Sequence, residues 1–358
     1  MRILYICTVD FSLTGIPVHI RNYYNILSKN NHIDIVAPHF FKNILKTMEL
    51  RNGTKLYALP RKSNPIKYLI YLHKIVKSKE YDVIHIHGNS STMALELFAC
   101  KNANSLLIVH THNVEYKSEI LNRILRKYML KNADLRFAAS KIAGDKLYGD
   151  NKYFVIKNGI EESNFRFNEK ERIKIREQLS LSKDKILLGN IGRFCEQKNQ
   201  NFLIEVAKGL DPEKYHFLLI GNNDNGFFKY IKQNDVANFF TVLPATSKIG
   251  RYYSAFDIFV FPSKWEGLGM VAVEAQYSNL PCLISLKVPK EVQISSNIKF
   301  LPLKAKVWSE AIKKTSIIRK NTIYTDKYNI KKCAYDIEKL YIAGIKKYEH
   351  KKNFKVGV

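Results

Sequence analysis

The stretch FPSKWEGLGMVAVEAQ, residues 261 to 276, decides how the second half of this 358-residue chain is organised. It places Glu266 and Glu274 eight positions apart across a glycine-rich turn, with an apolar run before the turn and a predicted helix after it. The N-terminus of a helix carries unpaired N–H groups and about half a positive charge, which suits a phosphate. The stretch therefore predicts a strand-turn-helix unit that binds a nucleotide sugar, with the diphosphate on the backbone and the carboxylates on hydroxyl groups.

This stretch resembles the Glu-x7-Glu signature of the retaining family-4 glycosyltransferases of GT-B fold. The matching positions are Pro262, Ser263, Glu266, Gly267, Gly269, Glu274 and Ala275, with Pro281 at the usual distance beyond them. The resemblance covers most of the chain, from the first loop to about residue 293. It implies an α/β fold of GT-B type: two Rossmann-like parallel-sheet domains facing across a cleft, with a C-terminal helix that crosses back to the first domain.

A dinucleotide-binding Rossmann site is the alternative for the same turn, because residues 267–272 also fit the pattern G-x-G-x-x-A. That fingerprint requires an acid at the end of the next strand, where it binds the ribose diol. The next predicted strand runs into Ser285, Leu286 and Lys287 without an acid, and the turn does not lie in the first βα unit. We therefore disfavour a dehydrogenase.

A second motif, GRFCEQKN at residues 192–199, directly follows the apolar run 186–191. It resembles the family's G-R-x-x-x-x-K element, in which Arg and Lys bind the donor diphosphate; Arg193 and Lys198 are the matches. Two cations can stabilise the charge that develops on a leaving diphosphate without a metal ion. The chain has no Asp-x-Asp triplet, so we expect no metal and no cofactor besides the nucleotide-sugar donor. Asn199 stands where the family usually has Gly, a departure expected to alter the turn.

The resemblance implies these catalytic residues: His112, Arg193, Lys198 and Glu266. It implies a donor site formed by Gly15, Arg193, Lys198, Glu266, Gly267, Leu268, Gly269, Met270 and Glu274. In that scheme Glu266 contacts the sugar hydroxyls and Glu274 binds the ribose diol, too close to the nucleotide to be the nucleophile. Retention would then proceed on one face of the sugar, with the leaving phosphate oxygen taking the acceptor proton. Gly15 is a weak signal, because Thr14 replaces the family's first loop glycine and Pro17 stands near its acidic position.

Histidines end two apolar runs, in DVIHIHG and in LLIVHTHN. The two-residue period of a strand puts His85 and His87 on one face, and likewise His110 and His112. By resemblance, His112 contacts the donor sugar. The four could also form a zinc quartet, but histidines at the ends of neighbouring strands usually stack without a metal, so we disfavour this alternative. We favour ordinary structural histidines with satisfied hydrogen bonds for His85 and His110.

Composition indicates two ordinary globular domains, with 46% hydrophobic residues and five scattered cysteines expected to be reduced. We predict domains at residues 1–165 (acceptor), 166–328 (donor) and a crossover helix with a basic tail at 329–358. No apolar run is long enough for a membrane span and no signal peptide is evident, so we expect a cytoplasmic protein.

The net charge of +26 is uneven: +11 over residues 1–150, +1 over 201–300 and +10 over 301–358. It favours an anionic partner, such as a membrane surface, a lipid diphosphate or nucleic acid, although a lysine-rich proteome would produce the same excess. We expect no nucleic acid, because no motif of specific spacing appears. The amphipathic segments 65–79 and 117–131 fit interfacial helices, but we favour core-facing helices.

Alternating apolar and helical segments predict parallel sheets. The predicted strands are 2–7, 32–36, 82–86, 105–109, 135–138, 154–156, 186–191, 216–220, 239–243, 257–261 and 281–285. The predicted helices are 16–28, 65–78, 92–102, 117–131, 141–147, 199–209, 226–233, 247–254, 269–278, 305–318 and 329–347. The charged segment 161–178 is taken as the boundary region.

We therefore expect a retaining, metal-independent hexosyltransferase that uses a UDP-sugar in surface polysaccharide biosynthesis, peripheral on the inner face of the membrane. Several segments resemble bacterial enzymes of capsule or exopolysaccharide assembly, whose acceptors are glycans on polyprenyl diphosphate. The alternatives are a GT-B nucleotide-sugar epimerase, a hydrolase, or a basic protein that binds membranes or nucleic acid without transferase activity.

Overall fold

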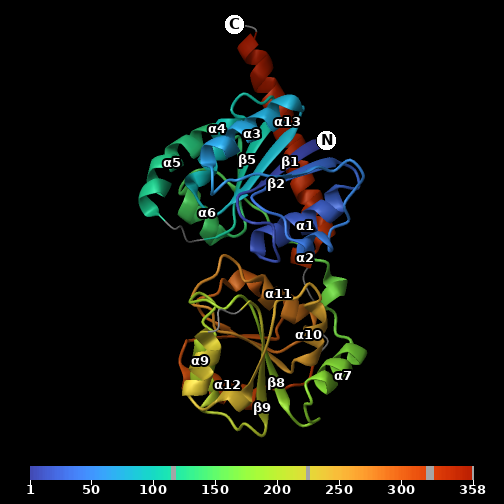
Figure 1. Cartoon of the computed structure of the whole chain (residues 1–358), viewed down its shortest axis with the longest axis vertical. Coiled ribbons are helices and arrows are strands. Elements are labelled where there is room, and N and C mark those ends of the chain that lie inside the picture. Colours follow the sequence, from blue (N-terminus) through green and yellow to red (C-terminus); the bar gives the residue numbers. More distant parts are fainter. Residues whose placement is uncertain (114–117, 223–225, 320–325, 357–358) are drawn as a thin grey trace. The chain divides into compact units, whose positions relative to one another are not determined.

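The computed structural model describes residues 1–113, 118–222, 226–319 and 326–356, and the chain divides into two compact units (Figure 1). Unit 1 comprises Met1–Ile160 together with Lys327–Val358, and unit 2 comprises Glu161–Asp326. The C-terminal helix therefore belongs with the N-terminal half of the chain. Each unit is built on its own parallel sheet.

Unit 1 contains a seven-stranded sheet of order β3-β2-β1-β4-β5-β6-β7, in which every neighbouring pair is parallel. Its strands are β1 (Arg2–Cys7), β2 (His32–Ala37), β3 (Leu56–Ala58), β4 (Val83–Gly88), β5 (Leu106–Thr111), β6 (Leu135–Ala138) and β7 (Phe154–Val155). The central strands are buried on both faces, which explains why they appear as apolar runs with little alternation.

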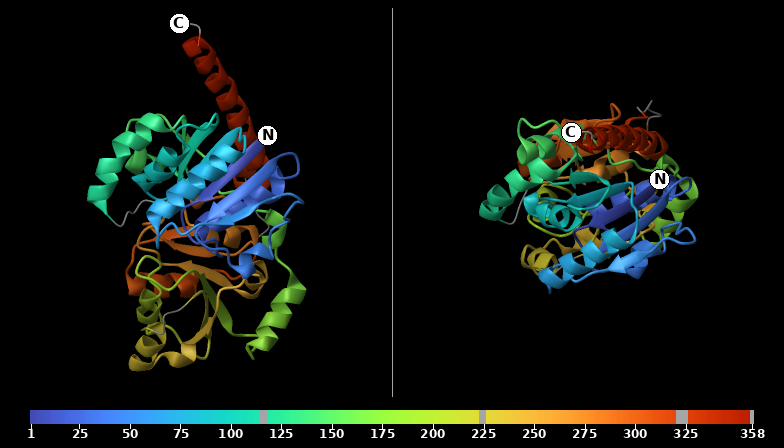
Figure 2. Two further views of the ribbon diagram at one scale, coloured as in Figure 1. Left: turned by 45° about the horizontal axis from the view of Figure 1, so that its top comes forward. Right: turned by 90° about the horizontal axis from the view of Figure 1, so that it is seen from above.

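Helices cover both faces of this sheet. They are α1 (Gly15–Leu27), α2 (Lys42–Leu45), α3 (Pro65–Ser78), α4 (Ala94–Cys100), α5 (Glu119–Asn132), α6 (Lys141–Tyr148) and α13 (Ile330–Val356). Tyr5 and Ile3 of β1 pack in a core with α1 and α13, whereas Leu4 and Ile6 pack in a second core with α3 and α4. Figure 2 shows α13, in red, on the opposite side of the blue strands from α3. The predicted return of the C-terminal helix to the first domain is confirmed.

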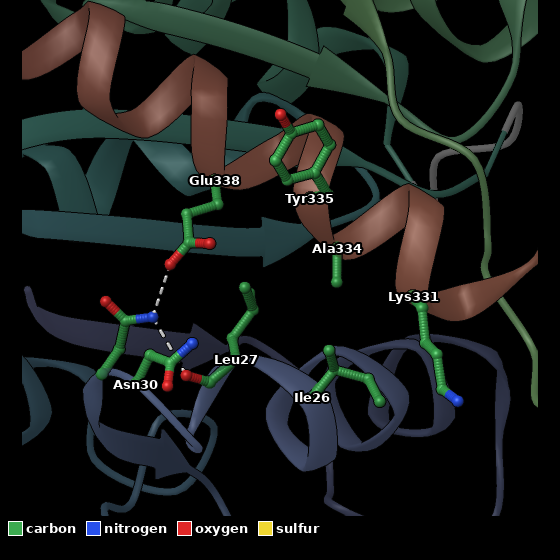
Figure 3. Close-up of a pocket in the computed structure, with 8 residues that line it drawn as sticks. Ile26, Leu27, Asn30, Lys331, Ala334, Tyr335 and Glu338 are labelled. Atoms are coloured by element: carbon green, nitrogen blue, oxygen red, sulfur yellow. Dashed lines mark hydrogen bonds between the residues drawn. The ribbon is translucent and has the colours of Figure 1, made fainter.

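A small cavity of about 100 Å³ lies between α1 and α13 (Figure 3). Its lining residues are Ile26, Leu27, Asn30, Asn31, Lys331, Ala334, Tyr335 and Glu338. Beside it, the side-chain N–H of Asn31 donates to Glu338 at 2.7 Å and to the Leu27 carbonyl at 3.0 Å. These bonds hold α13 against α1. The cavity therefore belongs to the packing of these two helices and is not part of the predicted site.

Unit 2 contains a six-stranded parallel sheet of order β10-β9-β8-β11-β12-β13. Its strands are β8 (Ile186–Ile191), β9 (Tyr215–Ile220), β10 (Phe240–Leu243), β11 (Ile258–Phe261), β12 (Cys282–Ser285) and β13 (Ile298–Leu301). Its helices are α7 (Glu169–Gln178), α8 (Asn201–Ala207), α9 (Gly226–Gln233), α10 (Gly250–Ala255), α11 (Met270–Tyr277) and α12 (Ala305–Lys314). The central pair β8 and β11 brings the two predicted donor motifs to one edge, since both motifs follow the carboxyl ends of their strands.

Several element predictions were wrong. The units do divide at the start of the charged segment 161–178, but this segment also contains α7, which was not predicted and which packs on α10. Arg172 and Arg176 of α7 both pair with the buried Asp257, at 2.6 Å and 3.0 Å, so charged pairs replace the apolar stripe that sequence patterns detect. The short edge strands β3 and β13 were missed. Helix α12 ends at Lys314 rather than 318, and α13 continues to Val356 rather than 347.

The prediction that the apolar stripe of residues 117–131 faces the core holds only in part, because only Leu125 and Tyr128 of that stripe pack against the core. Ile120, Leu121 and Ile124 are 76%, 45% and 67% exposed. The inward side of α5 carries Asn122, whose side-chain oxygen accepts from the Ser91 N–H, and Met129. Lys117, the predicted first residue, lies outside the described residues, and α5 begins at Glu119 after the Ser118 cap. Within the described ranges, no helix has both the length and the apolar character to cross a bilayer.

Candidate functional site

The turn between β11 and α11 requires glycine at one position. Gly269 has φ +94°, a left-handed conformation that side chains disfavour, and it occupies the N-cap of α11. An added Cβ would lie 3.1 Å from the Phe261 ring and 3.3 Å from Val288. No side chain caps α11, and its first turn contains no acid. The turn through Gly267 and Leu268 thus leads into a helix N-terminus, which carries a partial positive charge.

Glu266, just before this turn, meets the second motif directly. Its Oε1 lies 2.7 Å from Nζ of Lys198, and Oε2 accepts from Nε2 of Gln197 at 3.3 Å. The Lys198 and Glu266 side chains are only 20% and 6% exposed. Lys198 Nζ also lies 5.1 Å from the Phe261 ring centroid. The fold therefore brings together two motifs that are nearly seventy positions apart in the sequence.

Backbone contacts hold the two loops in register. The Lys264 N–H donates to the Gln197 carbonyl at 2.8 Å, and Gln197 Nε2 donates to the Trp265 carbonyl at 3.1 Å. Asn199 adopts φ +57° and its side-chain N–H donates to the Pro262 carbonyl at 3.1 Å. Asparagine tolerates this left-handed conformation, so the replacement of the family's glycine preserves a tight turn and adds a contact.

Two buried polar groups of the turn have no hydrogen-bond partner in the described parts of the chain, Oγ of Ser263 and Nε1 of Trp265. Sequence reasoning noted Ser263 as a family position only, and it overlooked Trp265 and Gln197. The only sequence signal for these residues was their position within the two motifs. Both orphaned groups can donate a hydrogen bond, a property that suits a site for an anionic ligand.

Arg193 differs from Lys198 in its surroundings. Its side chain is exposed and its guanidinium forms no ion pair or hydrogen bond with any residue that the structure describes. The loop beneath it is fixed, because Gln200 Nε2 donates to the Arg193 carbonyl at 3.2 Å and the Gly192 N–H donates to Ile220 at 2.9 Å. The site thus combines a paired cation with a cation that has no protein counter-ion.

Glu274 is half-buried on α11, where Oε2 accepts from the Tyr253 hydroxyl at 2.7 Å. Burial, reinforced by the Glu274 charge, raises the pKa of Tyr253 well above its ordinary value, so the hydroxyl keeps its proton and donates. Tyr253 lies on α10, and no sequence pattern pointed to it. It orients a carboxylate that sequence reasoning did identify.

The remaining predicted site residues, Gly15 and His112, belong to unit 1. Gly15 is exposed at the first position of α1, and no heavy atom lies within 4 Å of where its Cβ would be. Its local environment therefore does not require glycine. His112 directly follows β5, and its Nε2 lies 3.1 Å from Nδ1 of His87.

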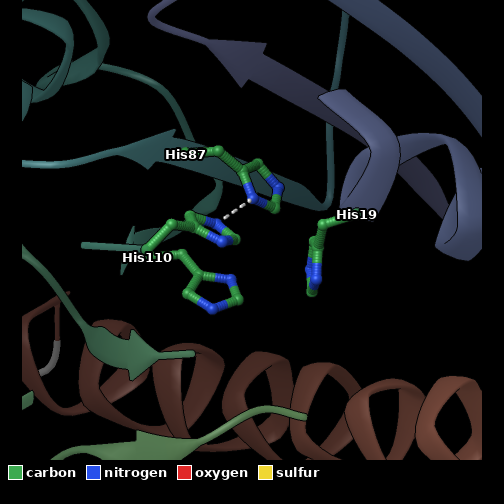
Figure 4. A group of neighbouring side chains, drawn as sticks. His19, His87 and His110 are labelled. Atoms are coloured by element: carbon green, nitrogen blue, oxygen red, sulfur yellow. Dashed lines mark hydrogen bonds between the residues drawn. The ribbon is translucent and has the colours of Figure 1, made fainter. Parts of the chain in front are cut away.

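Around His112 the structure gathers five histidines on the α1 side of the sheet. The predicted same-face pairs are confirmed, with ring centroids 3.9 Å apart for His85 and His87 and 4.0 Å apart for His110 and His112. His85 Nδ1 lies 2.7 Å from the Tyr341 hydroxyl, but neither ring nitrogen of buried His110 has a partner among the described residues. The expectation of a satisfied His110 was wrong. The fifth member, His19 of α1, was not predicted, because a lone histidine in a helix carries no pattern (Figure 4).

These sheets and the phosphate-suited turn at a carboxyl edge define a GT-B α/β protein. Two family models divide the chain between them: "Glycosyltransferase Family 4" matches residues 13–164, and "Glycosyl transferases group 1" matches residues 171–314. The chain belongs to the glycosyltransferases that these two domain families describe. The resemblance of the Glu-x7-Glu stretch is thereby confirmed at the level of the family.

Two similar proteins and one solved structure are consistent with the match to the family models. The chain is 25% identical to the capsular polysaccharide biosynthesis glycosyltransferase CapH of Staphylococcus aureus, over 78% of this chain and 81% of the relative. It is 28% identical to the UDP-Gal:alpha-D-GlcNAc-diphosphoundecaprenol alpha-1,3-galactosyltransferase of Escherichia coli, over 62% of both chains. The Anabaena protein Alr3699/HepE in complex with UDP-glucose shares the fold at a TM-score of 0.74 and 16% identity, over 99% of both chains.

Proposed function

We propose that this glycosyltransferase moves a hexose from a UDP-sugar, with retention at the anomeric carbon, to a glycan or polyprenyl-diphosphate-linked acceptor in surface polysaccharide biosynthesis. The observation that carries the proposal is the convergence of Lys198, Glu266 and the uncapped N-terminus of α11 at one edge of the unit 2 sheet. A cation, a carboxylate and free helix N–H groups together match a sugar diphosphate.

In this mechanism the cations act on the leaving group. Negative charge develops on the nucleoside diphosphate as the bond to the anomeric carbon breaks, and Arg193 and Lys198 stabilise it without a metal ion. Arg193 has no protein counter-ion in the described residues, so a phosphate can engage it without breaking an ion pair. Glu266 holds Lys198 in place before the donor binds and accepts from the sugar hydroxyls afterwards. The leaving phosphate oxygen takes the proton of the acceptor hydroxyl.

Other residues position the donor. Glu274, oriented by Tyr253, accepts from the ribose diol, and His112 contacts the sugar. The choice of uridine is supported by the names of two similar proteins, one a UDP-Gal transferase and the other bound to UDP-glucose. The acceptor class is supported by the diphosphoundecaprenol in the name of the Escherichia coli relative and by the capsular role of CapH.

A thermal-shift panel tests the donor site. The full chain is heated with UDP, GDP, ADP or CMP, and with their sugar conjugates, in the presence of a chelator. A ligand at ~100 times its Kd adds ~2.7 kcal/mol to the stability of the folded state, enough for a shift of several degrees. We expect stabilisation by the uridine set alone, weakened in Glu274→Ala and retained in Glu310→Ala, an exposed acid of α12.

Incubation of the UDP-sugar with and without acceptor then separates the reaction classes. A transferase forms a glycosylated product only when acceptor is present, and the anomeric configuration of that product, read by NMR, reports retention or inversion. Isomerised nucleotide sugar without acceptor would identify an epimerase, and free sugar would identify a hydrolase. Absence of any nucleotide shift, together with stabilisation by oligonucleotide, would favour a nucleic-acid-binding role instead.

We further propose that unit 1 rests on an anionic membrane through α5. Ile120, Leu121 and Ile124 are exposed, and basic Arg123 and Lys127 on the same helix are also exposed. An exposed apolar stripe beside cations is the pattern of an interfacial helix, and each cation near an anionic surface contributes ~1 kcal/mol. This arrangement would bring the enzyme to a lipid-linked acceptor.

Vesicle co-sedimentation tests the membrane proposal. We expect the chain to bind vesicles that contain phosphatidylglycerol and not neutral ones, and the variant Ile120→Ser/Ile124→Ser to lose most of this binding. The control Ile173→Ser alters an exposed isoleucine of α7, 49% exposed, and should bind as the parent does. Equal losses in both variants would argue against a specific role for α5.

A further inference from the structure

Four histidines of unit 1 converge from three separate elements. His19 comes from α1, His87 from β4, and His110 and His112 from the end of β5, and one nitrogen of each lies within 4.8 Å of the others' nitrogens (Figure 4). Ring centroids of His19 lie 5.0 Å from His110 and 4.8 Å from His112. His110 and His112 stack on each other with ring centroids 4.0 Å apart, and His19 meets both of them edge-on.

Four of the eight ring nitrogens in this group have no protein partner among the described residues. Nε2 of His19, Nε2 of His87 and both nitrogens of His110 are buried without a hydrogen-bond partner among the described residues. Each buried polar group left unsatisfied costs ~1–3 kcal/mol, and native proteins contain few such groups. Their accumulation at one point therefore indicates a ligand that accepts several imidazole lone pairs at once.

The surroundings fix His19 in a form that can bind such a ligand. Nδ1 of His19 lies 2.7 Å from the side-chain oxygen of Asn158, which can only accept, so this nitrogen carries the proton. The lone pair then resides on Nε2, the nitrogen within the cluster. A hydrogen bond from the outer nitrogen to an oxygen is the arrangement found behind metal-bound histidines.

We propose that His19, His87, His110 and His112 bind one divalent transition-metal ion, with Zn²⁺ as the expected metal. Neutral imidazole nitrogen is a preferred zinc ligand, and no carboxylate or thiol is part of the group. Zn–N bonds of ~2.0–2.1 Å place tetrahedral ligand nitrogens ~3.3 Å apart. His87 Nδ1 and His112 Nε2 lie 3.1 Å apart and share a hydrogen bond, and the ligand atoms of the four lie within 4.8 Å of one another, so binding an ion requires the side chains to draw together.

Four protein ligands leave no open position on a tetrahedral ion, so this site is structural rather than catalytic. The ion would fasten α1 to β4 and β5. The site lies in unit 1, whereas the proposed cations Arg193 and Lys198 belong to unit 2. Because His112 is also the proposed sugar contact, a bound ion would compete with that role.

Cobalt titration tests the site on the full chain. Chelator-treated protein without nucleotide is titrated with Co²⁺, whose visible absorption reports tetrahedral coordination, and Zn²⁺ then displaces it under calorimetry. We expect one ion per chain. His19→Ala and His112→Ala should weaken binding ~100-fold or more, and Asn158→Ala ~10–100-fold. His73→Ala and His216→Ala, which lie outside the cluster, should bind as the parent does.

Circular dichroism of each variant without metal checks folding, and His112 is the least buried ligand and so the safest to change. X-ray absorption of the zinc-loaded parent counts imidazole ligands independently of any variant. Fewer than three imidazoles, no tetrahedral cobalt spectrum, or unchanged affinity in His19→Ala would each overturn the proposal. The nucleotide panel contains a chelator, so failure of the metal site and failure of the donor site are distinguishable.

Discussion

The polar groups at the carboxyl edges of the two sheets differ in charge and in hydrogen bonding. In unit 2 the polar groups are charged and paired: Lys198 with Glu266 at 2.7 Å, and Glu274 with the Tyr253 hydroxyl at 2.7 Å. In unit 1 they are neutral imidazoles, and those of His110 have no partner in the described chain. The contrast follows from position, because the unit 2 groups lie on loops and helices, whereas His85, His87 and His110 lie within strands.

Position within the sheet explains the difference in charge. A charge inside a sheet must be paired at high cost, and strands β4 and β5 carry no acid or base beside their histidines. Burial therefore lowers the pKa of His85, His87, His110 and His112 well below the ordinary value. Unit 2 is thus suited to an anionic diphosphate, while the histidines of unit 1 suit a ligand that takes neutral nitrogen. Four predictions test this comparison, from the largest effect to the smallest.

Removal of the paired cation should affect chemistry most. Lys198→Ala is expected to lower kcat/KM by ~10²–10³-fold, because one fixed donor to the leaving group is lost. The matched control is Lys264→Ala, which breaks the pair with Glu196 between the same two loops. That pair is 41% and 76% exposed, so it contributes only ~0–1 kcal/mol. Steady-state kinetics of both variants provide the measurement. Near-parental activity in Lys198→Ala would contradict a catalytic role for the unit 2 site.

Acid should weaken unit 1 more than unit 2. The buried histidines have lowered folded-state pKa values, so their stabilising contribution is complete above the unfolded value near 6.5 and is lost as the pH falls toward the folded values, about 4 for His19. Each histidine can contribute a slope of up to ~1.4 kcal/mol per pH unit.

Both tryptophans, Trp265 and Trp308, and a single histidine, His216, lie in residues 161–326, so tryptophan fluorescence reports unit 2. Denaturant unfolding with chelator, followed by fluorescence and by far-UV circular dichroism, should give curves that separate as the pH drops from 7.5 to 5. Curves that remain coincident at every pH would contradict a difference between the units.

The two loop glycines should respond oppositely to alanine. Gly269→Ala must adopt a left-handed φ beside Phe261, so we expect a loss of ~1–3 kcal/mol in stability. Gly15→Ala has open space at the start of α1 and should be neutral or stabilising by up to ~1 kcal/mol. Thermal unfolding of the two variants measures this. Equal destabilisation would mean that Gly15 is conformationally required after all.

The smallest effect is expected for Tyr253, whose hydroxyl donates to the Glu274 carboxylate. Tyr253→Phe removes one hydrogen bond to that carboxylate, which corresponds to ~1 kcal/mol and about fivefold weaker binding of UDP. Tyr230→Phe, a partly exposed tyrosine of α9, is the control. Calorimetry with UDP provides the measurement, and unchanged affinity in Tyr253→Phe would show that Glu274 needs no orienting partner.

Local sequence signals were sufficient for much of the fold. Apolar runs located β1 and β8, and the glycine-rich turn located α11, because each depends on contacts among residues close in the chain. The same reasoning failed for α7, whose buried side carries Arg176 instead of an apolar stripe, and for the short edge strands β3 and β13. Such elements are stabilised by their neighbours in space rather than by their own pattern.

By itself, the sequence determined the family, the two parallel sheets and the motifs around Arg193 and Glu266, since residue type and spacing carry those properties. The tertiary structure alone decided that Lys198 pairs with Glu266, that Tyr253 orients Glu274 and that His19 completes a histidine cluster. Those contacts join residues far apart in the chain, and strand order and helix packing select them. The spacing of residues within a single segment encodes neither the strand order nor the helix packing.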